Sequence, residues 1–176
     1  MRQPKRLVTR VAGTALVIAP AAVLAVGSGT AAADGPTASN PQGATAVTLS
    51  TILRRCDFSN DTHVPGRGTG QAFAVISKPG SNTVSAEVHL HDQPDTHYNV
   101  RLILVPRASS ARCGPGEPGV ALGFLDTDWA GNATTTVQQG VLPGATGAWV
   151  FIEGPEGGNT PVLTGDFYTS DFVAAI

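Results

Sequence analysis

Two neighbouring stretches of the chain, residues 83–91 and 97–105, repeat their apolar side chains with a period of two. In each stretch four apolar residues occupy every second position. Successive side chains of a β-strand point to opposite faces, so this period of two predicts two strands that each bury one face. The side chains expected in the core are Val84, Ala86, Val88 and Leu90 in the first strand and Tyr98, Val100, Leu102 and Leu104 in the second.

Similar short segments recur along the rest of the chain, separated by turns rich in Gly, Pro and Asn. No segment keeps a helical period over ten residues. The pattern predicts an all-β fold, a single antiparallel immunoglobulin-like sandwich of about 7–9 strands, with a small β-barrel as the alternative. The expected strands are residues 48–54, 71–77, 83–91, 97–105, 120–126, 133–138, 148–153, 161–168 and 171–176.

The N-terminal segment has a different pattern, which is typical of an export signal. Arg2, Lys5, Arg6 and Arg10 precede an apolar run at residues 11–27, and three alanines at 31–33 form a small-residue cleavage site. We therefore expect a signal peptide at 1–33, a disordered leader at 34–47 and the β domain at 48–176. An uncleaved anchor is the alternative, because the run is nearly long enough to span a bilayer.

Removal of this signal would change the charge of the protein. The chain has 11 basic and 13 acidic residues, and the signal contains four of the basic ones, so the mature chain would carry 7 − 13 = −6. Nucleic acids and anionic lipids bind to basic surfaces. The negative net charge of the mature chain thus argues against a nucleic-acid partner. No stable membrane span is expected after cleavage of the signal. The expected location is extracellular or in the cell envelope.

Two cysteines, Cys56 and Cys113, are the whole cysteine content of the chain. In an exported protein they are expected to form a disulfide. A reactive or metal-binding thiol pair is the alternative, but the two residues lack the C-x-x-C spacing of redox and zinc sites.

Three of the four histidines lie close together in sequence and form a candidate metal site. If residues 83–91 and 97–105 form a hairpin, His91 faces His97, and His89 joins them on one exposed face. Such imidazoles could bind Cu(II), Zn(II) or Ni(II). The alternative is three solvated histidines. The same register pairs Glu87 with Arg101 as an exposed ion pair.

The aromatic residues fall into two groups, those expected in the core and one candidate for contact with a partner. Trp149, Phe73, Phe151 and Phe172 are expected in the core. Trp129 lies in a turn-like segment, where its ring either projects as a contact for a partner or folds back over the end of the domain. The same segment, residues 126–132, resembles a calcium loop only superficially, since it lacks the required acidic ligands.

Two segments carry a likeness to known proteins. Residues 85–90 (SAEVHL) followed by 94–102 (PDTHYNVRL), and the turn at 124–132 (FLDTDWAGN), resemble small secreted immunoglobulin-like β-sandwich proteins of high-GC Gram-positive bacteria. The resemblance covers roughly residues 48–176 and concerns turn chemistry. It implies the fold and export, and it implies no catalytic residues.

Catalytic motifs are not evident in the sequence. There is no G-x-S-x-G elbow, and no carboxylate lies in an apolar stretch that would raise its pKa. We therefore expect a secreted, non-enzymatic binding or cell-envelope module whose ligand the sequence does not identify, and no cofactor. A small extracellular metal-binding protein that uses the histidine cluster is the alternative.

Overall fold

The computed structural model describes residues 43–155 and 165–176, and these residues fold into strands and loops without a helix. All of them belong to one compact unit, Gly35–Ile176. The expected signal peptide, residues 34–42 of the expected leader and the first half of the expected strand at 161–168 lie outside the described residues. In the described part no helix is long and apolar enough to cross a membrane.

The described residues contain nine strands, and three of these (β3, β4 and β5) have the bounds predicted from the sequence. The first strand begins at Thr45, three residues before the expected start of the domain. The strands are β1 (Thr45–Ser50), β2 (Gln71–Gly80), β3 (Thr83–His91), β4 (His97–Val105), β5 (Val120–Asp126), β6 (Asn132–Gly140), β7 (Gly147–Glu153), β8 (Phe167–Ser170) and β9 (Ala174–Ala175).

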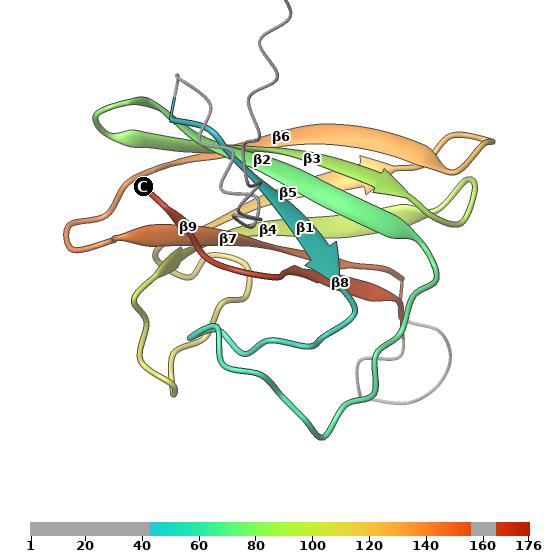
Figure 1. Ribbon diagram of the computed structural model, residues 1–176, viewed down its shortest axis with the longest axis horizontal. Coiled ribbons are helices and arrows are strands. Elements are labelled where there is room, and N and C mark those ends of the chain that lie inside the picture. Colours follow the sequence, from blue (N-terminus) through green and yellow to red (C-terminus); the bar gives the residue numbers. More distant parts are fainter. Residues whose placement is uncertain (1–42, 156–164) are drawn as a thin grey trace, which may run out of the picture. The chain divides into compact units, whose positions relative to one another are not determined.

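All strand pairs are antiparallel, and they form one sheet of order β5-β4-β7-β8-β1-β2-β3-β6, with β9 beside β7. The sheet folds over its own core, so that β1, β2, β3 and β6 form one layer and β4, β5, β7 and β8 the other (Figure 1). The layers are joined where Leu49 and Ser50 of β1 pair with β8. The predicted all-β antiparallel fold is confirmed.

The two ends of the sheet, β5 and β6, approach each other closely. A Cβ atom on Gly123 of β5 would lie 2.5 Å from Cγ2 of Val137 of β6, so the absence of a side chain permits this packing. The side chain of Gln139 on β6 donates a hydrogen bond of 2.8 Å to the backbone oxygen of Leu102 on β4. The architecture therefore lies between an open sandwich and a closed barrel.

The main core fills the space between the two layers and is built from the alternating positions of their strands. All eight side chains predicted to point inward from β3 and β4 are buried, with exposed fractions of 3% or less. They pack with inward residues of β1, β2, β5, β6, β7 and β8. Burial of this apolar surface is the main stabilising contribution to the fold.

A second, smaller core lies on the other face of β4, β7 and β8. Trp149 is fully buried there, and Phe58 packs against it edge to face with ring centroids 5.5 Å apart. The cover comes from the loops at 51–70 and 106–119, which the confirmed Cys56–Cys113 disulfide ties together. Because both faces of β7 are covered, six of its seven residues are buried.

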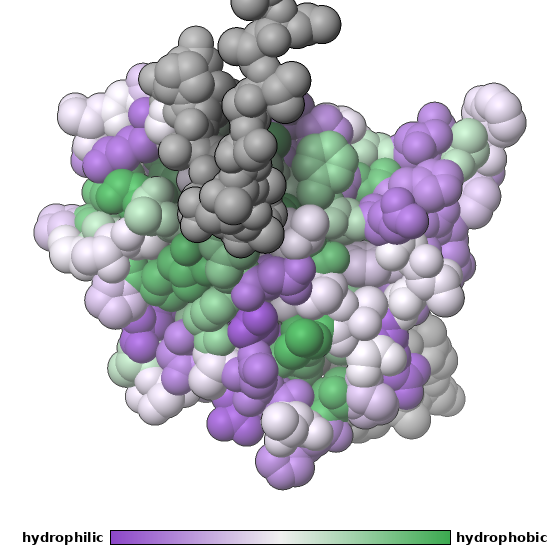
Figure 2. Space-filling view, viewed as in Figure 1, coloured by the Kyte–Doolittle hydropathy of each residue, from purple (hydrophilic) through white to green (hydrophobic). Residues whose placement is uncertain are grey.

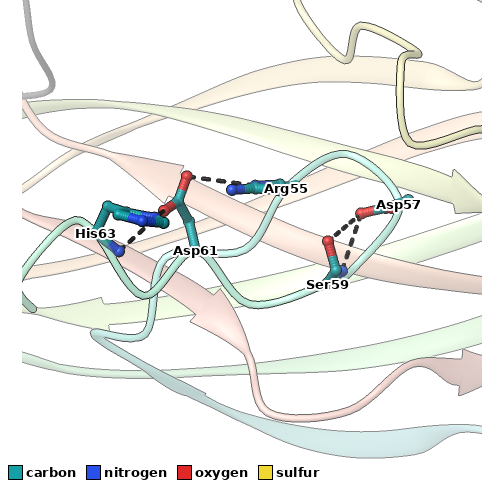
Figure 3. A network of polar contacts seen from close by, with 5 residues as sticks. All are labelled: Arg55, Asp57, Ser59, Asp61 and His63. Atoms are coloured by element: carbon teal, nitrogen blue, oxygen red, sulfur yellow. Dashed lines mark hydrogen bonds and ion pairs between the residues drawn. The ribbon is translucent and has the colours of Figure 1, made fainter.

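Short-range polar contacts shape the first of these loops (Figure 3). Asp61 accepts hydrogen bonds from the backbone N–H of His63 (3.0 Å) and from Arg55 Nε (3.4 Å). Asp57 accepts hydrogen bonds from the hydroxyl (2.6 Å) and the backbone N–H (3.0 Å) of Ser59. These donors lower the pKa of both carboxyl groups, so the loop is best ordered when both are ionised.

The predicted hairpin of β3 and β4 is wrong. β3 pairs with β2 and β6, whereas β4 pairs with β5 and β7, and residues 92–96 carry the chain from one layer to the other. The predicted pair of Glu87 with Arg101 is wrong for the same reason. Arg101 instead forms an ion pair with Glu153, and Glu87 contacts His89. The alternation of apolar residues determines which face a strand buries, but it does not determine which strands pair with it.

Candidate functional site

The three histidines of the predicted metal site lie in different layers. His89 and His91 project from the outer face of β3, whereas His97 on β4 contacts Asp126 of β5, with Nδ1 and Oδ1 2.6 Å apart. Both ring nitrogens of His89 already contact neighbouring side chains. Among residues 43–155 and 165–176 no three side chains of the types that bind metal ions form a group.

The outer face of β2, β3 and β6 contains a hollow of about 250 Å³. The strand register builds it from two adjacent rows of side chains that cross the three strands. Phe73, His89 and Thr134 form one row, and Gln71, His91 and Asn132 form the next. The lining residues are Gln71, Phe73, His89, Leu90, His91, Asn132, Ala133 and Thr134.

Contacts among these side chains hold the rings in place. Phe73 and His89 stack nearly parallel, with ring centroids 4.3 Å apart. His89 Nε2 lies 2.8 Å from Oε1 of Glu87, and its Nδ1 lies 3.1 Å from Oγ1 of Thr134. In the next row His91 Nδ1 lies 3.0 Å from Oδ1 of Asn132. These contacts fix the orientation of the stacked pair.

Phe73 was expected in the core, and that prediction is wrong: 45% of the residue is exposed. Residues 71–77 have apolar side chains at both odd and even positions, so their alternation does not reveal the buried face. The structure buries Ala72, Ala74 and Ile76 and turns Phe73 outward. Phe172 is likewise exposed, at 42%, whereas Trp149 and Phe151 are buried as predicted.

A second hollow, of about 520 Å³, occupies the other end of the same outer face. Its lining residues are Ala44, Val75, Ser77, Lys78, Pro79, Ser85, Glu87 and Thr136. The contact of Glu87 with His89 lies between the two hollows, because each of these residues lines one of them. We call the two hollows together the outer groove.

Trp129 lies at the turn between β5 and β6 and is 82% exposed, so its ring projects and does not fold back. The turn itself is firmly held. Asp128 Oδ1 accepts hydrogen bonds from the backbone N–H groups of Ala130 (2.8 Å) and Asn132 (2.9 Å). The Asn132 N–H, and then that of Ala130, lower the pKa of the Asp128 carboxyl. Asp128 is thus a turn residue.

The outward face of β5 carries two further exposed apolar residues, Leu122 (49%) and Phe124 (62%). The Phe124 ring lies near that of His97, with centroids 5.8 Å apart. Hydrophobic residues in the view of Figure 2 lie in several patches separated by hydrophilic ones. Exposed aromatic side chains of this protein therefore occur on both layers and at the β5–β6 turn.

A polar cluster that the sequence did not indicate lies where the chain crosses between layers. The Tyr168 hydroxyl donates a 2.6 Å hydrogen bond to Oδ2 of Asp92 and accepts one of 2.9 Å from the Gly70 N–H. Burial, and then the Asp92 carboxylate, raise the pKa of Tyr168 and of Tyr98. Both phenols therefore stay neutral, and the Tyr168 hydroxyl donates a hydrogen bond that helps to fix the crossing.

Comparison of the chain with protein-family models, with curated proteins and with solved structures finds no match in any of the three.

Proposed function

We propose that this protein is an exported, non-enzymatic binding module of the cell surface or extracellular space, built on an immunoglobulin-like β-sandwich. The observation that carries the proposal is Trp129. A tryptophan with 82% of its surface exposed gives up favourable burial, which is expected where a partner covers the ring.

The turn that presents Trp129 supports the proposal further. The Asp128 backbone N–H donates to the Asn132 oxygen at 2.9 Å, in addition to the two bonds that the Asp128 carboxylate accepts. A fixed turn loses little conformational entropy when a partner binds, so more of the contact energy contributes to affinity. The disulfide is compatible with an oxidising compartment outside the cytoplasm.

Export is tested by expressing the full chain in a high-GC Gram-positive host and sequencing the N-terminus of the protein recovered outside the cells. We expect a start near Asp34, because the small-residue cleavage site ends at residue 33. A chain that still begins at Met1, or that stays in the cytoplasm, would contradict export.

Binding is tested by sedimenting the exported protein with isolated envelopes of the same host. We expect saturable binding that Trp129→Ala weakens at least about tenfold, as is typical of an aromatic residue that dominates an interface. Phe172→Ala is the matched control, because it removes another exposed aromatic residue from a different part of the surface. Absence of binding, or equal loss in both variants, would refute the proposed role of Trp129.

A further inference from the structure

We propose that the outer groove binds a neutral carbohydrate polymer. This inference depends on the proposed function, since it names the ligand class of a binding module, but it concerns a different surface from the Trp129 turn.

The extent of the outer groove suits a chain better than a single small molecule. It runs along β2 from the position of Ser77 to that of Gln71, and along β3 from Ser85 to His91. Six residue steps of a strand correspond to roughly 20 Å. Two hollows of about 250 and 520 Å³ follow one another over this length.

The chemistry of the outer groove suits a ligand with many hydroxyl groups and no charge. Its polar side chains are mainly hydroxyls, amides and imidazoles, which both donate and accept hydrogen bonds. The formal charges in the lining are Lys78 and Glu87, which cancel. A polyanion such as a nucleic acid would require a surplus of basic residues. The uncharged polar residues of the lining are Gln71, Ser77, Ser85, Asn132, Thr134 and Thr136.

An apolar strip accompanies these polar groups. Phe73 and Val75 are successive outward residues of β2, one in each hollow. Sugar rings present patches of C–H groups between their hydroxyls, and such patches pack favourably on apolar side chains. Because His89 supports the Phe73 ring, little side-chain freedom is lost on binding.

The strand pairing argues against an extended peptide in the outer groove. Peptides commonly bind to sheets by adding a strand at a free edge. β2 lies between β1 and β3, and β3 lies between β2 and β6, so the main-chain groups of both strands are already paired. Recognition on this face must therefore use side chains, as the polar lining indicates.

The test is a microarray of neutral and acidic oligosaccharides of increasing length, probed with the exported protein, followed by calorimetric titration with the neutral oligosaccharides that bind. We expect neutral glycans to bind, with affinity that rises with chain length. Affinity should change less than about twofold between low and high salt, because screening acts on charged ligands.

Phe73→Ala and Gln71→Ala are expected to weaken glycan binding, the first at least about tenfold. Both positions are exposed, so both variants should fold. Phe124→Ala is the matched control, because it removes an exposed phenylalanine from the other layer and should leave the affinity unchanged.

Binding of acidic glycans alone, binding of no glycan, or neutral-glycan binding that survives Phe73→Ala would overturn the inference. If envelopes still bind through Trp129 while neutral glycans do not bind, the proposed function stands and this inference fails. If neither binds, both fail.

Discussion

Removal of the Cys56–Cys113 disulfide by double substitution to alanine tests how the second core is held. The bridge joins residues that are 57 positions apart in sequence. On the loop-entropy model, a cross-link of that span stabilises the folded state by about 4 kcal/mol. Single domains are commonly stable by roughly 5–15 kcal/mol, so the loss would be a large share of the total.

The effect on the melting temperature follows from the size of the domain. With an unfolding entropy of about 2.1 cal/mol/K per residue over the described residues, 43–155 and 165–176, a loss of about 4 kcal/mol lowers the melting temperature by roughly 15 °C. The loss should be concentrated in the loops that cover Trp149, because the bridge joins those loops directly.

Thermal melts followed by circular dichroism measure the drop in melting temperature. Urea unfolding followed by tryptophan fluorescence measures the loss in the loops that cover Trp149. A reducing agent should lower the melting temperature of the wild type to that of the double variant, and it should leave the double variant unchanged. If the oxidised, reduced and doubly substituted proteins melt within about 2 °C of one another, the assigned role of the bridge is wrong.

Three further predictions follow from single contacts. Tyr98 and Tyr168 are the two tyrosines of the chain, and the pKa of each is raised, so the folded state favours the neutral phenols. Their contribution to stability is complete below the ordinary tyrosine pKa of about 10 and is lost as the pH rises above it. Absorbance at 295 nm should therefore show phenolate only well above pH 10; ordinary titration near pH 10 would contradict this. Gly131→Ala should destabilise the protein by at least about 1 kcal/mol more than Gly144→Ala in urea unfolding. Both residues have positive φ, but a Cβ atom at Gly131 would lie 2.1 Å from a backbone oxygen of the β3–β4 connection, and one at Gly144 meets nothing within 4 Å. Equal losses would refute that reasoning. Trp129→Ala should change the free energy of unfolding by less than about 0.5 kcal/mol, because the ring is exposed; a larger loss would show that the ring packs on the domain.

The sequence predicted the local elements well where one face is uniformly apolar. β3, β4 and β5 begin and end at the predicted residues, and the inward side chains of β3 and β4 are those that the alternation indicated. The disulfide was predictable because two cysteines allow a single pairing.

Strand pairing was harder to predict, because it depends on contacts that alternation does not encode. A hairpin and a crossing between layers bury the same faces of β3 and β4. The short connection at 92–96 favoured a hairpin, but Tyr168 and Gly131 hold this connection between the layers: the Tyr168 hydroxyl donates a hydrogen bond to the Asp92 side chain, and the Asp92 backbone N–H donates one to the Gly131 oxygen. These partners lie 76 and 39 residues away from Asp92.

The candidate site was only partly predictable for a related reason. The sequence predicted His89, His91 and His97 on one face, and the first two do share the outward face of β3. Their neighbours Phe73 and Thr134 come from strands whose register was unknown. In β2 small alanines occupy the core and the large phenylalanine faces solvent, which reverses the usual preference. Pairing of the strands, more than any motif, creates the outer groove.

The most direct test of the outer groove as the ligand-binding surface is an NMR titration of the ¹⁵N-labelled exported protein with a mixture of neutral oligosaccharides. We predict saturable amide shifts along the outward positions of β2, β3 and β6, including Phe73, His89 and Thr134, with the amide of Phe124 on β5 unchanged. Shifts confined to β5 and β4, or no shifts at saturating oligosaccharide, would show that the outer groove is not the ligand-binding surface.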